Sequence, residues 1–291
     1  MAADPAKVAH NRLGLWTSSL ILIALLVGFV FLVDVLASRL PGALTEPQLI
    51  MAGLLLCLVP AFLWLAFFYV QDRREPEPKH NVFGVFLLGG LLAAAIGQPI
   101  IRQVFQVQEW MYESWWVQLL ASVLIIGFVQ QFLQYAAVRF SIYHSSEFDE
   151  RVDGVIYAVA AGLGYATVLN FAYVLEHRGV DLGVGAMMVT IDALALAGFA
   201  GLIGYFLGQA KFETTPAYWM PLGVALASVL NGIFYFLADQ VTLQGFKFTP
   251  LNGVILAAVF AFVVLTIVFF LIRRANAETL AIARLQETPP A

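Results

Sequence analysis

Residues 49–70 read LIMAGLLLCLVPAFLWLAFFYV and contain no charged side chain. A helix over this stretch, rising about 1.5 Å per residue, covers the hydrocarbon core of a bilayer, which is about 30 Å thick. Apolar runs of similar length recur through the rest of the chain, near residues 14–37, 82–104, 116–140, 154–175, 183–209, 217–238 and 250–272. The sequence therefore predicts an all-α fold, a polytopic membrane bundle of about eight transmembrane helices.

The composition agrees with a chain whose surface faces lipid. Of the 291 residues, 61% are hydrophobic and only 12% are charged, whereas a soluble domain carries about 25% charged residues. A soluble core of this length could not absorb so much apolar surface. The net charge of −4 is too small to indicate nucleic acid as a partner. We therefore expect membrane lipids, and other membrane proteins or transmembrane peptides, as the partners.

Short loops and the distribution of basic residues set the predicted topology. No loop is long enough to fold alone, so we expect a transmembrane bundle at 14–273 between polar tails at 1–13 and 274–291. Of the 15 Lys and Arg residues, 11 fall on one side of the predicted membrane and 4 on the other. The positive-inside rule then places both termini in the cytoplasm, in a multi-pass protein of the inner or plasma membrane. The third run is interrupted at 97–99 by Gly-Gln-Pro, which predicts a kink or an early end.

Polar side chains inside four consecutive runs form the candidate site. Each lies several residues from the end of its run, where lipid leaves an isolated polar group unsolvated. Small residues recur at every fourth position beside them, as in Ala158, Gly162 and Ala166, and such stripes let helices pack closely. We therefore expect a tightly packed polar centre made by Gln130, Gln131, Gln134, Asn170, Asp192 and Asn231.

A shared polar centre constrains the depth and the tilt of the fourth run in the membrane. We expect Gln130 or Gln131 to lie within hydrogen-bonding reach of at least one polar side chain from the next three runs. The run boundaries place the glutamines nearer the middle or the cytoplasmic half of the bilayer, and place Leu169, Asp192 and Asn231 in the outer half. A shared pocket therefore requires the fourth run to be shifted, long or tilted, and tilts of about 20° are common.

The residue types limit what the centre can do. Amides have no titratable proton near neutral pH and cannot act as general acids or bases, so their alternative role is to join helices by hydrogen bonds. Asp192 is the one ionisable side chain deep in the group. It suits a proton relay, a structural carboxyl or half of a buried pair, and the lack of a basic partner in the runs favours the structural role. The four histidines are scattered through tails and loops and no HExxH occurs, so we expect no metal and no cofactor.

Two motifs resemble a known family. Residues 69–78 read YVQDRREPEP, residues 153–157 read DGVIY, and residues 162–173 read GLGYATVLNFAY. The PrsW family of glutamic-type intramembrane proteases has a similar Asp-Arg…Glu-Pro segment. It also has a run of the form Asp-Gly-Ile-Val-Tyr followed by Gly-Leu-Gly-Phe-Ala-x-x-Glu-Asn-x-x-Tyr. The resemblance covers a core of about residues 60–238.

The same resemblance implies that the catalytic residues have been replaced. The family's Glu-Glu-x-x-Lys motif falls on Gln130, Gln131 and Gln134, and the glutamate of its Glu-Asn pair falls on Leu169 before the retained Asn170. The family's histidines in the sixth and seventh spans fall on Asp192 and Asn231. Glutamine keeps the shape of glutamate without its charge, and leucine cannot take part in proton transfer. We therefore expect no catalytic residue at these positions.

Three functions follow from these observations. The first is a pseudoprotease that binds transmembrane segments or membrane-protein partners in a polar cleft without cutting them. The second is an active intramembrane peptidase that uses Asp192, with Asp153 or Glu176, or other acids. The third is a structural accessory subunit of a larger membrane complex. The first and third both need only a shaped helical surface, so the sequence does not separate them.

Overall fold

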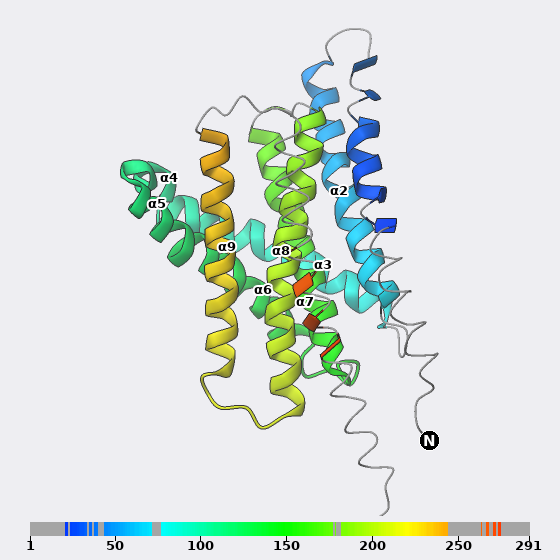
Figure 1. Ribbon diagram of the computed structural model, residues 1–291, viewed down its shortest axis with the longest axis vertical. Coiled ribbons are helices and arrows are strands. Elements are labelled where there is room, and N and C mark those ends of the chain that lie inside the picture. The colour runs from blue at the N-terminus through cyan, green and yellow to red at the C-terminus, as the bar shows by residue number, and fades with distance from the viewer. Residues whose placement is uncertain are drawn as a thin grey trace, which may run out of the picture.

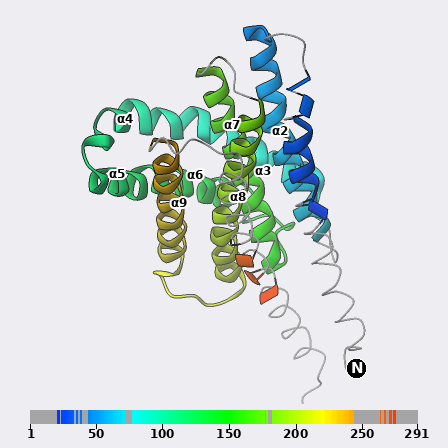
Figure 2. The same ribbon diagram turned by 45° about the horizontal axis from the view of Figure 1, so that its top comes forward.

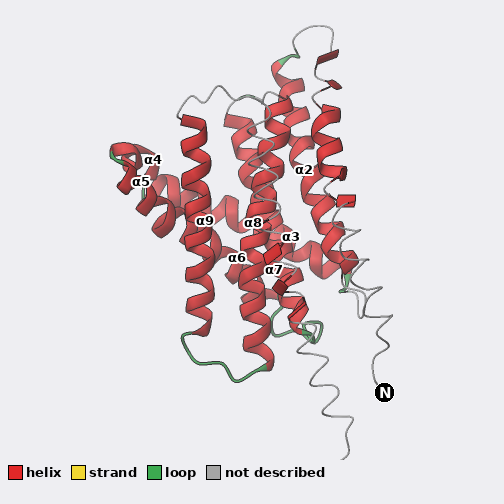
Figure 3. Cartoon of the chain, in the orientation of Figure 1, coloured by secondary structure: helices red, strands yellow, loops and turns green. Residues whose placement is uncertain are grey.

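The computed structural model describes residues 21–22, 24–33, 35–36, 38–39, 44–71, 77–176, 178 and 182–243, with seven isolated positions between 263 and 274. Within these residues the chain is helical and has no strand (Figures 1 and 3). Six helical stretches are long and apolar enough to cross a membrane: Glu46–Phe67, Lys79–Glu113, Trp115–Ser141, Arg151–Glu176, Met188–Phe212 and Trp219–Asp239. The predicted helical membrane bundle is thereby confirmed.

The two remaining predicted spans lie mostly outside this range. From the first, 14–37, the structure describes a shorter apolar helix, Ala24–Val33. From the last, 250–272, it describes only a few separate residues. Five of the six spans begin and end within about five residues of the predicted runs, because uninterrupted apolar sequence fixes a membrane helix strongly. The third, Lys79–Glu113, continues well past its predicted end at 104.

The helices follow one another with few irregular residues. In chain order the α-helices are α2 (Glu46–Gln71), α3 (Lys79–Leu92), α4 (Val107–Trp110), α5 (Trp115–Ala121), α6 (Phe128–Ser141), α7 (Arg151–Glu176), α8 (Leu182–Phe212) and α9 (Trp219–Leu243). Three π-helical segments widen the third and fourth spans: η1 (Ala93–Gly97), η2 (Ile100–Val104) and η4 (Ser122–Gly127). A 3-10 turn, η3 (Met111–Glu113), joins α4 to α5.

α7 is the central helix, and small residues bring its neighbours close to it. A Cβ added to Gly162 would lie 2.8 Å from both the Ala200 Cβ and the Leu196 carbonyl oxygen of α8. On another face, Gly164 approaches the backbone of α3 so closely that any side chain would collide with the Phe86 carbonyl. The close packing predicted from the small-residue stripe is therefore present around Gly162.

The third and fourth spans cross the others obliquely. Figure 1 shows α3 and α6 running across the upright helices α7, α8 and α9, and Figure 2 shows the same crossing from a second angle. This tilt brings the middle of the fourth span level with the parts of α7, α8 and α9 that carry Asn170, Asp192 and Asn231, as the predicted shared centre requires.

The third span neither ends nor breaks at Pro99. Helical residues continue through η2, and the chain turns only at Gln106, whose φ of 47° is left-handed. Proline lacks the N–H needed for a regular α-helical bond, and the wider turns of η1 and η2 lie directly before and after it. Of the predicted kink or early end, the early end is therefore wrong, because π-helical turns accommodate the proline.

Candidate functional site

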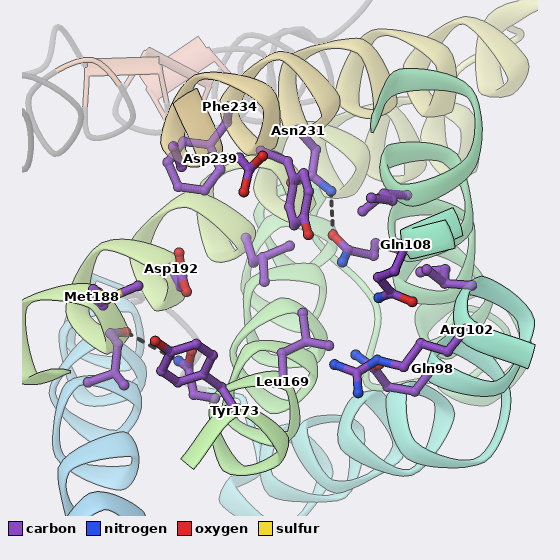
Figure 4. A pocket seen from close by; sticks show the side chains of 18 of the residues that line it. Gln98, Arg102, Gln108, Leu169, Tyr173, Met188, Asp192, Asn231, Phe234 and Asp239 are labelled. Carbon is purple, nitrogen blue, oxygen red and sulfur yellow. Dashed lines mark hydrogen bonds between the residues drawn. The ribbon is translucent and has the colours of Figure 1, made fainter. Parts of the chain in front are cut away.

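A cavity of about 300 Å³ opens among the third, fourth, fifth, sixth and seventh of the predicted runs (Figure 4). Its walls include apolar side chains from all these spans, among them Ile126, Leu169 and Met188. Its polar and charged lining residues, the two tyrosines Tyr173 and Tyr235 aside, are Gln98, Arg102, Gln108, Gln130, Asn170, Asp192, Asn231 and Asp239. Four of the six predicted polar residues, and Leu169, therefore face one space.

A buried amide pair joins the fourth span to the seventh. The Asn231 Nδ2 donates a hydrogen bond of 2.8 Å to the Gln130 Oε1, and the two residues are 2% and 6% exposed. This is the contact expected from the sequence. It forms because η4 and α9 cross at glycine: a Cβ on Gly232 would lie 2.6 Å from the Ser122 carbonyl oxygen. Only a residue without a side chain allows α9 to approach so closely.

The amide pair leaves hydrogen-bonding capacity unused. In the part of the chain that the structure describes, no group bonds the Gln130 Nε2 or the Asn231 Oδ1. A third amide, Asn170, donates through Nδ2 to the Val189 carbonyl of α8 at 3.4 Å, and its own Oδ1 has no described donor. The cavity thus offers both donors and acceptors from side chains that are almost fully buried.

Two carboxylates line the same cavity, and they differ in their partners. Asp239 on α9 accepts hydrogen bonds from the Gln118 Nε2 of α5 and, at 3.5 Å, from the Tyr112 hydroxyl of η3. Asp192 on α8 is partly exposed on the cavity wall, and no hydrogen bond or ion pair reaches it from the described residues. The structural hydrogen bond favoured for Asp192 from the sequence is therefore not found in this part of the chain.

The other two glutamines lie elsewhere. Gln131 and Gln134 are almost completely buried on α6, and neither lines the cavity. Within the described residues, none of their side-chain nitrogen and oxygen atoms has a hydrogen-bond partner. One residue turns the side chain by about 100° around a helix, and four residues carry it about 6 Å along the axis. On an oblique helix, these steps are enough to separate both glutamines from the cavity.

A second polar cluster lies at the opposite end of α7. The Tyr157 hydroxyl donates to Glu77, and Asp153 accepts from the backbone N–H of Asp149 at 2.9 Å. This cluster joins the YVQDRREPEP and DGVIY motifs in space. Asp153 precedes Asn170 by 17 residues on one helix, which is about 25 Å. Asp153 therefore does not share the cavity.

Sequence reasoning missed several residues of the lining. Asp239 falls just past the predicted end of the seventh run, and Arg102 lies two residues before the predicted end of the third. The structure places both on the cavity wall, where Arg102 pairs with Glu176 at the end of α7. Gln98, noted only as part of a helix interruption, lines the cavity as well. A polar residue beside a proline inside an apolar run was the signal that could have identified it.

Comparisons with known proteins point to one family. A family model described as PrsW family intramembrane metalloprotease matches residues 77–276. Protease PrsW of Bacillus subtilis (strain 168) is 30% identical over 182 residues, covering 62% of this chain and 79% of that protein. Protease PrsW of Geobacillus kaustophilus (strain HTA426) is 30% identical over 188 residues, covering 64% and 78%. Protease PrsW of Oceanobacillus iheyensis is 27% identical over 224 residues, covering 77% and 95%. No solved structure matches the chain significantly.

The description of the family as metalloproteases implies a catalytic metal, so the residues of the cavity can be compared with the ligands that such a metal requires. A catalytic zinc takes three protein ligands from histidine, glutamate, aspartate or cysteine. The described residues contain no group of three such side chains able to hold a metal ion. The cavity supplies amides and two carboxylates, of which Asp239 is already held by Gln118 and Tyr112. The donor set on the described part of the chain therefore does not fit a catalytic metal.

Proposed function

Since this chain belongs to the PrsW family of intramembrane metalloproteases, we propose that it keeps a membrane-embedded cleft of that family and binds transmembrane segments there without hydrolysing them. The observation that carries the proposal is the hydrogen bond between Gln130 and Asn231. These positions correspond, by the motif resemblance, to a glutamate and a histidine of the family. In this chain an amide–amide contact occupies the place of an acid–base pair.

The unused amide groups suit a peptide backbone. An extended or unwound peptide presents N–H and C=O groups that lipid cannot satisfy. The Asn231 Oδ1 can accept from such an N–H, and the Gln130 Nε2 can donate to such a C=O. Both side chains are almost fully buried, so bonds made to them are shielded from water. The apolar walls, which include Ile126, Leu169 and Met188, suit the side chains of a membrane helix.

The same residues do not suit hydrolysis by the family's route. Cleavage needs a general base to activate water and a general acid to protonate the leaving amine, and each contributes about 10² to 10⁴ in rate. Gln130 and Asn231 offer neither, and Leu169 offers no polar atom at all. The cleft therefore lacks an acid and a base at the positions that correspond to the family's catalytic residues.

One observation supports a second candidate, an active peptidase. Asp192 and Asp239 line the same cavity from neighbouring helices, so two carboxylates face one bound segment. Of the acids proposed from the sequence to assist Asp192, Asp153 is remote and Glu176 is paired with Arg102. Asp239 is the better placed of the three. Cleavage of a single-span substrate that is lost in both Asp192→Asn and Asp239→Asn would establish this candidate in place of the first.

The membrane setting of the proposal is a multi-pass protein of the plasma membrane with both termini in the cytoplasm. The orientation rests on the bias of 11 against 4 basic residues in the predicted loops. Cysteine labelling of a residue near Lys79 tests it. Labelling from the cytoplasmic side is expected, and labelling only from outside would reverse the orientation.

Site-specific photo-crosslinking tests the binding itself. A photoreactive residue replaces Met188, which lines the cavity, or Phe140 as control, which is 79% exposed on α6. The full chain is reconstituted in liposomes with defined single-span peptides. Adducts from position 188 and not from position 140 are expected, and they should weaken in Asn231→Leu. Equal adducts from both positions would refute a specific cleft.

A further inference from the structure

The cavity has an uneven balance of charge. Its described lining holds two carboxylates, Asp192 and Asp239, against one cation, Arg102. Arg102 already pairs with Glu176, a carboxylate that does not line the cavity. The remaining polar lining is made of neutral amides and tyrosines. An occupant therefore meets two acidic groups with no lining cation left over to balance them.

The two carboxylates differ in the hydrogen-bond donors that reach them. Asp239 is held by donors from α5 and η3, the Gln118 amide and the Tyr112 hydroxyl. Asp192 receives no donor within the described residues, although its side chain is partly buried as that of Asp239 is. Figure 4 shows it on the α8 wall, near Met188 and across the space from Arg102. Asp192 is thus the lining carboxylate that has neither a hydrogen-bond donor nor a cation as a partner in the described part of the chain.

A carboxylate enclosed by membrane helices is stabilised by a cation or by strong donors, since lipid and apolar side chains supply neither. The same holds in reverse for a lysine or arginine inside a transmembrane segment, which is costly in lipid and pairs with an acid when it can. The amide donors of the cavity do not balance the charge of Asp192. A segment that brings its own cation satisfies both side chains at once.

We propose that the cavity selects transmembrane segments that carry a lysine or arginine, whose cation pairs with Asp192, with Asp239 adding to the attraction. This inference rests on the proposed binding function and names the class of segment that the cleft takes. The backbone is held by the amides of Gln130 and Asn231, and the cationic side chain supplies the selectivity. Segments with a neutral or acidic residue at the same depth bind less well.

The test compares peptides that differ at one position. Four single-span peptides carry lysine, norleucine, glutamine or glutamate at the same depth, and crosslinking from position 188 of the full chain in liposomes measures capture. We expect the lysine peptide to be captured about tenfold better than the norleucine peptide, as close charge pairs at buried interfaces allow. Asp192→Asn should abolish that preference, and cooperative unfolding of the purified variant in mixed detergent–SDS micelles, as for the wild type, shows that the variant folds.

Matched variants separate a local pairing from a general effect of charge. Glu147→Gln removes an exposed carboxylate outside the cavity and should leave the lysine preference intact. Asp239→Asn should reduce the preference less than Asp192→Asn. Equal capture of all four peptides, or a lysine preference that survives Asp192→Asn, would overturn this inference and leave the binding function standing. Capture of no peptide would overturn the binding function and this inference with it.

Discussion

Replacing Gly232 by alanine is expected to separate α9 from η4 and to break the amide pair that defines the candidate site. The new Cβ would lie 2.4 Å from the Val123 Cα and 2.6 Å from the Ser122 carbonyl oxygen. An ordinary carbon–carbon contact is about 3.5 Å, so α9 must move by about 1 Å. When α9 moves away along the direction of the bond, the Asn231–Gln130 distance of 2.8 Å becomes about 3.8 Å, beyond a normal hydrogen bond.

The magnitude follows from three terms. Overpacking a close contact costs about 1 to 3 kcal/mol, and the lost hydrogen bond about 1 kcal/mol. Alanine gains up to about 1 kcal/mol over glycine in a helix interior. The expected net loss in the free energy of unfolding is therefore about 1 to 4 kcal/mol. Unfolding in mixed detergent–SDS micelles, followed by tryptophan fluorescence, measures it.

Gly84 on α3 supplies the matched control. A Cβ added there meets nothing within 4 Å, so Gly84→Ala keeps the gain in helix propensity without a collision. We expect this variant to be at least as stable as the wild type. If Gly232→Ala is as stable as Gly84→Ala, the close crossing of η4 and α9 does not hold the amide pair.

Three further predictions concern single side chains. Asn231→Leu should lower the free energy of unfolding by about 1 to 3 kcal/mol, because Gln130 is left unpaired, and the added Gln130→Leu should recover most of the loss in a double-mutant cycle. Arg102→Gln should change stability by less than about 1 kcal/mol, since Arg102 and Glu176 are 38% and 44% exposed. Burial raises the pKa of Tyr143 above 10.0, so the folded state holds that proton more tightly than the unfolded state, and stability should fall as the pH rises through the raised pKa. Tyr143→Phe should lack this part of the fall when unfolding is compared below and above that pH.

The fold could be predicted from the sequence because membrane helices are specified locally. An apolar run of about 20 residues must satisfy its backbone within itself, so span positions follow from composition alone. The course of the third span was less predictable. The Gly-Gln-Pro at 97–99 predicts a kink or an early end, yet the helix continues through η1 and η2, whose wider turns are not evident in the residue types.

The candidate site was predicted only in part, and the physical reason is helix rotation. Gln130, Asn170, Asp192 and Asn231 line the cavity, whereas Gln131 points elsewhere on the same helix. Neighbouring glutamines have equal polarity, so their sequence alone does not tell which one faces the partner helices.

Residues near the ends of spans were harder still to place. Asp239 and Arg102 look like interfacial charges in a sequence, because a charge near a boundary usually reaches water. Here the hairpin of α4, η3 and α5 folds back beside α9, where Gln118 bonds Asp239. The position of this hairpin over Asp239 depends on tertiary packing between segments that are far apart in the sequence, which hydropathy does not encode.

The central claim, binding without hydrolysis, is tested most directly by mass spectrometry of one reconstituted sample. The purified full chain, with the photoreactive residue at position 188, is incubated in liposomes with a lysine-bearing single-span peptide and then irradiated. Intact peptide crosslinked to the protein, with no cleavage fragments before irradiation, is the predicted result. Cleavage fragments that form when Asp192 is present and disappear in Asp192→Asn would contradict binding without hydrolysis. They would identify an active peptidase that uses the carboxylates of the cavity.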